Sequence, residues 1–382
     1  MRDDGKRWPR RGRQPSSTCC AGEPVGLTRL DLGEFEALAP QWDALLAERD
    51  GPFLTSAWLA AWWGAFAPED RLALALMDGD RLVAGGCFRE HRGALASAAN
   101  AHSNDWGIAC RDLAAARRFW EEVVALGHRR FALAPVLSDG RGAPASRAVL
   151  DAAGYRVVEE ALEPSPWLEL PASMDALLAE RSRNLRSQVG RRRRALEREG
   201  ELTLRVVCDG PSLEQDLDSF FALEAAGWKG REQTALACED TLLDLYRGFA
   251  RATAADGSLR LYLLELNERL IAADYGCVFD GCGYLIKTAF DEDLERFAPG
   301  LVLRAAVLES SIEEGLSRYD FLGGPDDYKL RWADRLRGRA ALYAWSGPGA
   351  PVAYALRRHF RPAAKRARDL VRDRVARAGG GR

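Results

Sequence analysis

The sequence predicts an α/β fold of the α+β kind, in which two tandem domains of the same topology each contain a mixed sheet. The chain has 382 residues, more than the roughly 150 of one ordinary domain, and its 47% hydrophobic content is typical of folded proteins. Strand-like and helix-like apolar patterns alternate along the chain. Two stretches, 71–88 and 260–279, repeat one pattern, which indicates a duplicated domain.

The two repeated stretches resemble β-hairpins. Each has an apolar strand, a short polar turn and a second strand that begins Arg-Leu-Val-Ala or Arg-Leu-Ile-Ala. The turns are Asp-Gly at 78–79 and Asn-Glu at 267–268. Alternating apolar residues on both sides of a tight turn are typical of hairpins. A predicted strand, at 27–32 or 202–207, and a helical region precede each hairpin.

The pattern continues in the second copy. A further turn at 280–281 leads into a strand at 284–290. Alternation predicts one face with Tyr284, Ile286, Thr288 and Phe290, and the other with Leu285, Lys287 and Ala289. Pro299 then opens an apolar helix that ends at Gly315. A strand, a Gly-Gly-Pro turn, a short helix and a last strand complete the order β-α-β-β-β-α-β-α-β.

These patterns divide the chain into four segments. Residues 1–24 are expected to form a disordered basic leader, because they lack hydrophobic periodicity. Residues 25–173 form the first domain and residues 174–348 the second. The basic segment 349–382 follows as a helix or tail. The aromatic-rich helix 52–66 of the first domain is expected to lie in the core or at the interface between the domains.

The charge, the hydrophobic runs and the cysteine and histidine content indicate the compartment and the cofactors to expect. The net charge is −2, with basic residues concentrated at both ends and in one central segment. No run of about 18 apolar residues is present, and the N-terminus lacks the apolar core of a secretory signal, so we expect a cytoplasmic protein. The eight cysteines form no CxxC pair and the four histidines show no metal-ligand spacing. The sequence therefore predicts reduced thiols and no metal.

Three segments point to a family. Residues 319–332 read YDFLGGPDDYKLRW, residues 298–303 read APGLVL, and the Arg-rich stretch 181–200 lies upstream. In this order they resemble the CelD-like acetyltransferases, a branch of the GNAT superfamily related to the Fem peptidyltransferases, which use aminoacyl-tRNA. The resemblance covers about residues 176–346, and the segment 52–63 also resembles the N-terminal part of that family.

The resemblance implies a GNAT-type fold in which acetyl-CoA or another acyl-CoA lies in a V-shaped opening between two splayed central strands. A small molecule with a primary amine would accept the acyl group. The strand end at Thr288, Ala289 and Phe290 would supply backbone N–H groups that polarise the acyl carbonyl.

The donor's phosphates would lie at the start of the following helix. Gly300 and Leu301 offer backbone N–H groups there, and Arg304 would add a charged contact. The usual GNAT pyrophosphate loop, Q/R-x-x-G-x-G/A, is absent, and only Pro299-Gly300 marks the equivalent helix start.

Three residues near the Gly-Gly-Pro turn are the candidate catalytic residues. Tyr328 is suited to be the general acid for the departing thiolate, or else it packs as an aromatic residue. Lys329 would hold a phosphate or stabilise developing negative charge. Asp320 lies within an apolar strand, where a buried carboxylate must be hydrogen-bonded, and is expected to order the site.

Two basic segments have alternative interpretations. The helix with Arg183 and Arg186 and the run 191–194 either presents a solvated charged face or grips a phosphate of CoA, tRNA or a nucleotide-linked sugar. The C-terminal segment 354–377 either contacts an acidic membrane surface transiently or is a soluble tail. No feature indicates a DNA partner.

Three functions follow as hypotheses. The first is N-acyl transfer to an amine, such as an amino sugar or another precursor of an envelope polysaccharide. The second is aminoacyl transfer from charged tRNA, as in the Fem relatives; the absence of a coiled-coil insertion between the halves argues against it. The third is a non-catalytic GNAT-like component of a polysaccharide-synthesis complex, which the missing pyrophosphate loop favours.

Overall fold

The computed structural model describes residues 25–47, 50–66, 70–227, 231–232 and 235–360. The predicted leader, and the C-terminal segment beyond residue 360, lie outside these residues.

The first half of the chain folds into a strand, four helical segments, a hairpin, and then further strands and helices. Its elements are β1 (Gly26–Leu30), α1 (Leu32–Ala37), α2 (Ala39–Asp43), η1 (Pro52–Leu54), α3 (Ser56–Phe66), β2 (Arg71–Asp78), β3 (Arg81–His91), β4 (Ala94–Ser97), β5 (Ile108–Cys110), α4 (Leu113–Ala125), β6 (Arg130–Leu137), α5 (Ala143–Ala152) and β7 (Arg156–Glu169).

The second half repeats this plan after two linking helices. Its elements are α6 (Met174–Ala179), α7 (Arg183–Glu197), β8 (Leu202–Val207), α8 (Leu213–Ala226), η2 (Leu236–Cys238), α10 (Asp240–Ala255), β9 (Leu259–Leu266), β10 (Arg269–Phe279), β11 (Cys282–Phe290), η3 (Glu292–Phe297), α11 (Pro299–Glu313), β12 (Arg318–Asp320), α12 (Asp327–Leu330), β13 (Arg335–Trp345), α13 (Ala350–Ala355) and η4 (Leu356–Phe360).

The predicted hairpins form because their turns suit left-handed backbone. Gly79 has a φ of 57° between β2 and β3, and Asn267 and Glu268 have φ values of 49° and 64° between β9 and β10. In the second hairpin, two successive left-handed residues match the twist of the flanking strands. Both hairpins occupy the same place in their halves, which confirms that the chain contains two copies of one mixed-sheet fold.

In the described residues, thirteen strands form one sheet with a mirrored order. The order is β1-β2-β3-β4-β6-β13-β7-β12-β11-β10-β9-β8, with β5 paired to β3. In each half one pair is parallel, β4 with β6 and β11 with β12. The last strands are exchanged: β7 of the first half pairs with β12, and β13 of the second half pairs with β6.

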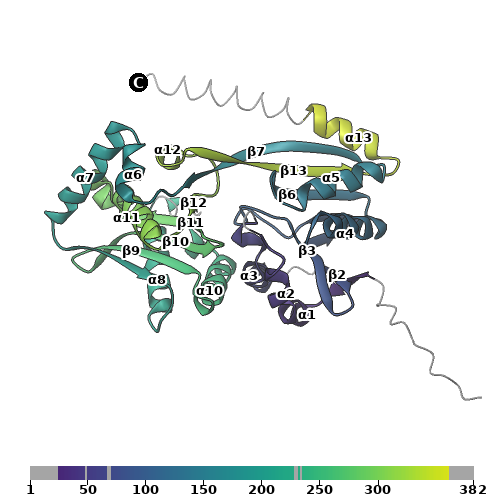
Figure 1. Ribbon diagram of the computed structural model, residues 1–382, viewed down its shortest axis with the longest axis horizontal. Coiled ribbons are helices and arrows are strands. Elements are labelled where there is room, and N and C mark those ends of the chain that lie inside the picture. Colours follow the sequence, from purple (N-terminus) through teal and green to yellow (C-terminus); the bar gives the residue numbers. More distant parts are fainter. Residues whose placement is uncertain (1–24, 48–49, 67–69, 228–230, 233–234, 361–382) are drawn as a thin grey trace, which may run out of the picture.

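The exchanged strands join the halves. β7 and β13 pair with each other antiparallel from Trp167↔Arg335 to Arg156↔Trp345 and run side by side across both halves (Figure 1). Each half-sheet is therefore completed by a strand from the other half. The predicted domain boundary at residue 173 therefore separates two segments of the chain, but the sheet continues across both of them.

A shared aromatic core lies below this joint. α3, which carries the predicted aromatic stretch, packs against α10 of the second half (Figure 1). The Trp58 ring lies 5.1 Å from that of Phe249 and 6.3 Å from that of Tyr246, centroid to centroid. The aromatic helix thus lies in the core and at the interface between the halves, as predicted.

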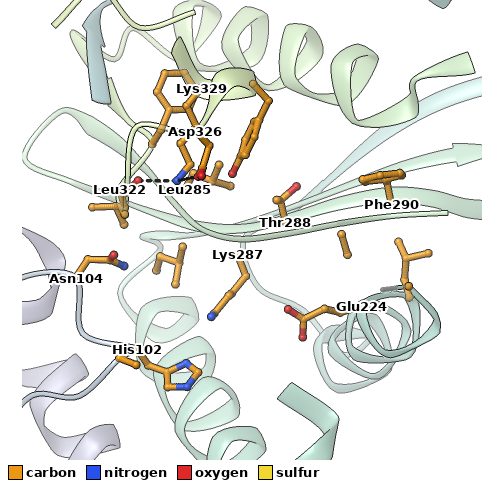
Figure 2. Close-up of a pocket in the computed structure, with 18 of the residues that line it drawn as sticks. His102, Asn104, Glu224, Leu285, Lys287, Thr288, Phe290, Leu322, Asp326 and Lys329 are labelled. Carbon is orange, nitrogen blue, oxygen red and sulfur yellow. Dashed lines mark hydrogen bonds and ion pairs between the residues drawn. The ribbon is translucent and has the colours of Figure 1, made fainter. Parts of the chain in front are cut away.

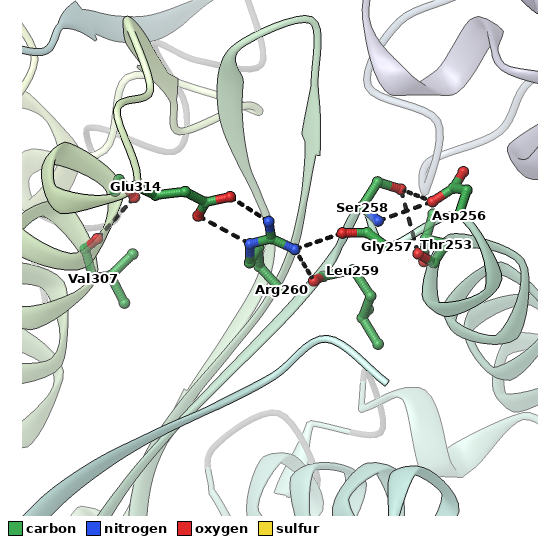
Figure 3. Close-up of polar contacts among 9 residues, drawn as sticks. Thr253, Asp256, Gly257, Ser258, Leu259, Arg260, Val307 and Glu314 are labelled. Atoms are coloured by element: carbon green, nitrogen blue, oxygen red, sulfur yellow. Dashed lines mark hydrogen bonds and ion pairs between the residues drawn. The ribbon is translucent and has the colours of Figure 1, made fainter. Parts of the chain in front are cut away.

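One arginine ties both helical layers of the second half to the sheet. Arg260, on β9, forms a two-pronged ion pair with Glu314 at the end of α11 and donates to the carbonyls of Gly257 and Leu259 after α10 (Figure 3). These contacts fix the positions of β9, α10 and α11 relative to one another at this end of the sheet. Within the described chain, no helix is long and apolar enough to cross a bilayer, and the six described cysteines are free thiols.

Candidate active site

A cavity opens where β11 and β12 separate. The two strands pair only from Cys282↔Arg318 to Tyr284↔Asp320. β11 then continues to its end, while the chain after β12 turns away at Leu322, whose φ is 52°. The resulting cavity of about 560 Å³ is lined by residues of both halves, among them Ala101, His102, Asn104, Glu224, Lys287, Thr288, Ala289, Phe290, Leu322, Asp326, Tyr328 and Lys329 (Figure 2).

β11 contains a β-bulge at this opening. On β10, Tyr275 pairs with Lys287 and the next residue, Gly276, pairs with Leu285. Ile286 is therefore the extra residue of β11. Bulges commonly redirect a side chain beside an active site.

The bulge divides the cavity lining between the two faces of the sheet. Ile286 belongs to the core formed with α8 and α10, and the Lys287 Nζ lies on the same side, 5.5 Å from the Tyr246 ring centroid. Thr288 and Phe290 point to the opposite side, toward α11 and α12 (Figure 2). The predicted alternation along 284–290 is therefore wrong beyond Ile286, because the bulge shifts its phase.

The α11 side of the cavity contains several of the predicted site residues. Thr288, Phe290 and Tyr328 line it. The missing side chain of Gly300 leaves space beside Phe290, since an added Cβ would lie 3.7 Å from that ring. α11 begins without a side-chain cap, whereas the corresponding helix α4 is capped by the Asp112 carboxylate, 2.8 Å from the Ala115 nitrogen. The start of α11 therefore carries no capping carboxylate, unlike that of α4, and its backbone N–H groups and helix dipole favour an anion more strongly.

Lys329 lines the cavity but its ammonium group holds the loop after β12. Its Nζ donates to the carbonyls of Leu322 and Gly324, at 2.9 and 3.2 Å, and lies 2.9 Å from an Asp326 carboxylate oxygen. These three contacts match the three N–H donors of a lysine. The ammonium group is therefore not available to grip a phosphate, the role expected from the sequence, and instead positions the loop after β12.

Replacing Lys329 by alanine is expected to lower the free energy of unfolding by about 1.5–3 kcal/mol, the usual contribution of hydrogen bonds from a charged donor. The affinity for an acyl-CoA should change little, because the ammonium group is already engaged. Denaturant unfolding and calorimetric titration measure both quantities, with Arg331→Ala, an exposed residue at the end of α12, as the control. A large loss of acyl-CoA affinity at unchanged stability would restore the phosphate role.

Asp320, at the end of β12, also holds the loop that follows this strand. Its Oδ1 accepts hydrogen bonds from the Leu322 backbone nitrogen and from the Ser165 hydroxyl on β7, both at 2.8 Å. Burial raises the pKa of this carboxyl above its ordinary value. The residue is only 4% exposed and does not line the main cavity. It is a site-ordering residue, as the apolar strand around it suggested, and not a catalytic one.

Arg339, which the sequence did not single out, holds the carbonyl of Gly323 in the same loop and two carbonyls of the first half. From β13 it donates to Gly323 O at 3.1 Å, to Asn104 O at 3.0 Å and to Glu163 O at 2.9 Å. The exchanged strand thus fastens a first-half loop to the rim of the second-half cavity. No local pattern in the sequence links these four positions.

Arg304 is a correction to the sequence-based site. It lies on the core side of α11, 3% exposed, with its Nη2 2.7 Å from the Asp274 carboxylate on β10 and its Nη1 donating to the Tyr319 hydroxyl at 2.9 Å. A guanidinium committed to a buried ion pair is not available to a bound phosphate. Its position one turn into the helix points it toward the sheet.

Arg183 and Arg186 are also separate from the cavity. α7 packs on α11 and buries Leu185 and Val189 in the core. The two arginines lie on the opposite, exposed face of α7 and are absent from the described cavity lining. Gly300 and Leu301, by contrast, lie at the start of α11 beside the cavity wall.

The α10 side of the cavity contains residues that the sequence analysis missed. His102, from the loop after β4 in the first half, faces Lys287 on β11 and Glu224 on α8 (Figure 2). Its Nδ1 lies 3.1 Å from the Tyr246 hydroxyl oxygen. Burial, and then the Lys287 charge, lower the pKa of His102 to about 4 against a weaker opposing effect of Glu224. The imidazole is therefore neutral at physiological pH.

Comparison with known proteins agrees with this geometry. A family model for the acetyltransferase (GNAT) domain matches residues 183–330, which include β11, α11, β12 and α12. No curated protein sequence matches the chain significantly.

Solved structures share the fold at low identity. FemX is 12% identical, with a TM-score of 0.58 over 87% of this chain and 99% of FemX. The C-terminal domain of a candidate lysylphosphatidylglycerol synthetase from Agrobacterium fabrum is 13% identical, with a TM-score of 0.53 over 84% and 97% of the two chains. A conserved protein of unknown function from Bacteroides thetaiotaomicron is 13% identical, with a TM-score of 0.51 over 85% and 100%. Residues 183–330 thus match a GNAT acetyltransferase domain, and this match supports an acyltransferase.

Proposed function

We propose that the protein transfers an acyl group from acyl-CoA, with acetyl-CoA as the first candidate, to a primary amine. The acceptor is an amino sugar or another precursor of an envelope polysaccharide, as the resemblance to CelD-like acetyltransferases implies, and the reaction takes place in the cytoplasm. One observation carries the proposal: the cavity between β11 and β12 has polar side chains on both faces of the sheet. The donor can then place its acyl carbonyl in the cavity from one face of the sheet, and the amine can reach that carbonyl from the other face.

The α11 side suits the donor. The start of α11 presents backbone N–H groups and the positive end of the helix dipole, which favour a pyrophosphate. Gly300 leaves room there for close approach of a ligand to the backbone. Beyond Tyr284, β12 no longer pairs with β11, so the acyl carbonyl can lie along this edge of β11 and accept a backbone N–H there.

The chemistry needs a proton donor for the leaving group. The amine nitrogen attacks the thioester carbonyl, the C–S bond of the tetrahedral intermediate breaks, and the thiolate takes a proton. Tyr328 lines the cavity on the donor side, where the residue is 43% exposed, and the partial burial of its phenol raises the pKa to about 12. The phenol therefore stays protonated at neutral pH and is suited to that step.

A second candidate is aminoacyl transfer from charged tRNA. The observation that favours it is the exposed face of α7, which carries Arg183, Arg186, Arg191 and Arg194. Such a stripe is suited to a phosphate backbone. The shared fold with FemX supports the architecture of this candidate and not its donor.

Binding of acetyl-CoA tests the proposal. A concentration of 100 times the Kd should stabilise the folded protein by about 2.7 kcal/mol, seen as a rise in the melting temperature. Gly300→Glu should abolish the rise, because it places a carboxylate at the start of α11. The matched control is Gly64→Glu, on an exposed part of α3 with open space around it. Stabilisation by charged tRNA, but not by acetyl-CoA, would favour the second candidate.

A further inference from the structure

The α10 side of the cavity brings together side chains from both halves of the chain. His102 comes from the loop after β4, Glu224 from α8, Tyr246 from α10 and Lys287 from the bulge of β11. Figure 2 shows His102, Lys287 and Glu224 on the side of β11 opposite to Thr288. This is the side from which the acceptor would approach.

We propose that His102 is the general base of the acyl transfer, taking the proton of the attacking amine on Nε2 while Tyr246 holds Nδ1. The inference rests on the proposed function and adds to it a catalytic group that the first half supplies to the second. The GNAT-matched segment, 183–330, would then be incomplete as a catalytic unit without the first half.

The imidazole is held in place by a rigid partner. Tyr246 is fully buried, its ring packs against Trp58, and its carbonyl accepts a hydrogen bond from the Tyr275 hydroxyl at 2.8 Å. Burial raises the pKa of Tyr246 well above its ordinary value, so the phenol stays neutral. Its oxygen can accept the Nδ1–H of His102, which leaves the Nε2 lone pair for the substrate.

The loop that carries His102 is also anchored. The His102 backbone nitrogen donates to the Asn100 side chain at 2.9 Å, and the Asn104 carbonyl accepts from Arg339. Arg339 also holds the carbonyl of Gly323, next to Asn104 at the rim of the cavity. The base and the rim of the cavity therefore share one anchor.

Burial, and then the Lys287 charge, keep His102 in the unprotonated form that a base requires. Lys287 on β11 and Glu224 on α8 are the charged groups that act on it, and Tyr246 on α10 is neutral. With a pKa of about 4, the imidazole has a lone pair across the physiological range. Base strength falls with pKa, so this imidazole is a weaker base than a free histidine. The ammonium formed when the amine adds to the carbonyl is more acidic than a free ammonium, which offsets part of that difference.

The protons balance. The amine adds to the thioester carbonyl and one N–H proton passes to Nε2 of His102. The C–S bond then breaks and the thiolate receives a proton from Tyr328. The imidazolium releases its proton to water and Tyr328 regains one. The net reaction converts amine and thioester into amide and thiol.

Glu224 is the competing base on this side. Its Oε2 accepts the Leu236 backbone nitrogen at 2.9 Å, where it holds the short helix η2 against α8, and the residue is only 3% exposed. That contact gives the carboxylate a structural role. Glu224→Gln therefore separates the two assignments.

The test uses the full chain, acetyl-CoA, and a panel of primary amines that includes glucosamine and ethanolamine, with release of the CoA thiol as the signal. If none of these amines accepts the group, hydrolysis of bound acetyl-CoA by water serves as the reaction. His102→Gln should lower kcat by about 10²–10⁴-fold, with the Kd for acetyl-CoA unchanged. The matched control is His128→Gln, a buried histidine outside the cavity.

Two further measurements distinguish a base from a packing residue. Imidazole should restore part of the activity of His102→Ala, which a merely structural histidine would not allow. The wild-type hydrolysis rate should fall only as the pH drops toward 4, and the variants should lose that dependence. Normal turnover in His102→Gln, or loss of turnover in Glu224→Gln alone, would overturn the inference. Failure of acetyl-CoA to bind the wild type would instead reject the proposed function.

Discussion

Replacing Arg304 by alanine is expected to lower the free energy of unfolding by about 3–5 kcal/mol, the cost of breaking a buried ion pair. The substitution removes the guanidinium that lies 2.7 Å from the Asp274 carboxylate and bonds the Tyr319 hydroxyl. Asp274 is 0% exposed, so water cannot replace the lost cation there. The loss would loosen the packing of α11 on β10 and β12.

Chemical denaturation followed by tryptophan fluorescence measures this effect. Arg183→Ala is the matched control, because that arginine is exposed on α7 and its loss should change stability by less than about 0.5 kcal/mol. If Arg304→Ala were as stable as the control and instead bound acetyl-CoA weakly, the phosphate contact expected from the sequence would be correct. The two outcomes differ both in the free energy of unfolding and in the affinity for acetyl-CoA.

The elements that the sequence predicted well depend on local chemistry. The hairpin turns at Gly79 and Asn267 need left-handed backbone, which these residues tolerate, and the flanking alternation identifies the strands. The exchange of β7 and β13 was not predictable, because it is decided by pairing between residues far apart in sequence, such as Trp167 and Arg335. The sequence shows that strands exist there but not which neighbours they choose.

The site was predictable only in part, for the same reason. Thr288 and Tyr328 lie next to recognisable turns and line the cavity as expected. Arg304 was misassigned because nothing near it in sequence reveals the carboxylate of Asp274 on another strand. His102 was missed because its partners lie more than a hundred residues away. The bulge at Ile286 hid the direction of Lys287, since an alternation rule assumes a regular strand.

Tyr328→Phe is expected to lower kcat by about 10²–10⁴-fold, the usual contribution of a general acid, with little change in KM or in acetyl-CoA affinity. The substitution removes only the hydroxyl that would protonate the departing thiolate. Burial raises the pKa of this phenol to about 12, against an opposing effect of Arg304, so activity should not fall through its ionisation below about pH 11. Tyr343→Phe on β13, where the ring packs on Arg357, is the control.

The nature of the leaving group decides whether the hydroxyl acts as an acid. An acetyl thioester of a more acidic thiol leaves as a stable thiolate and needs no proton in the transition state. The defect of Tyr328→Phe should therefore shrink toward the wild-type rate as the thiol of the donor becomes more acidic. A defect of equal size with every donor would mean that the hydroxyl orients the substrate instead. Because Lys329 keeps the loop in place in both cases, the comparison isolates the chemistry of one oxygen atom.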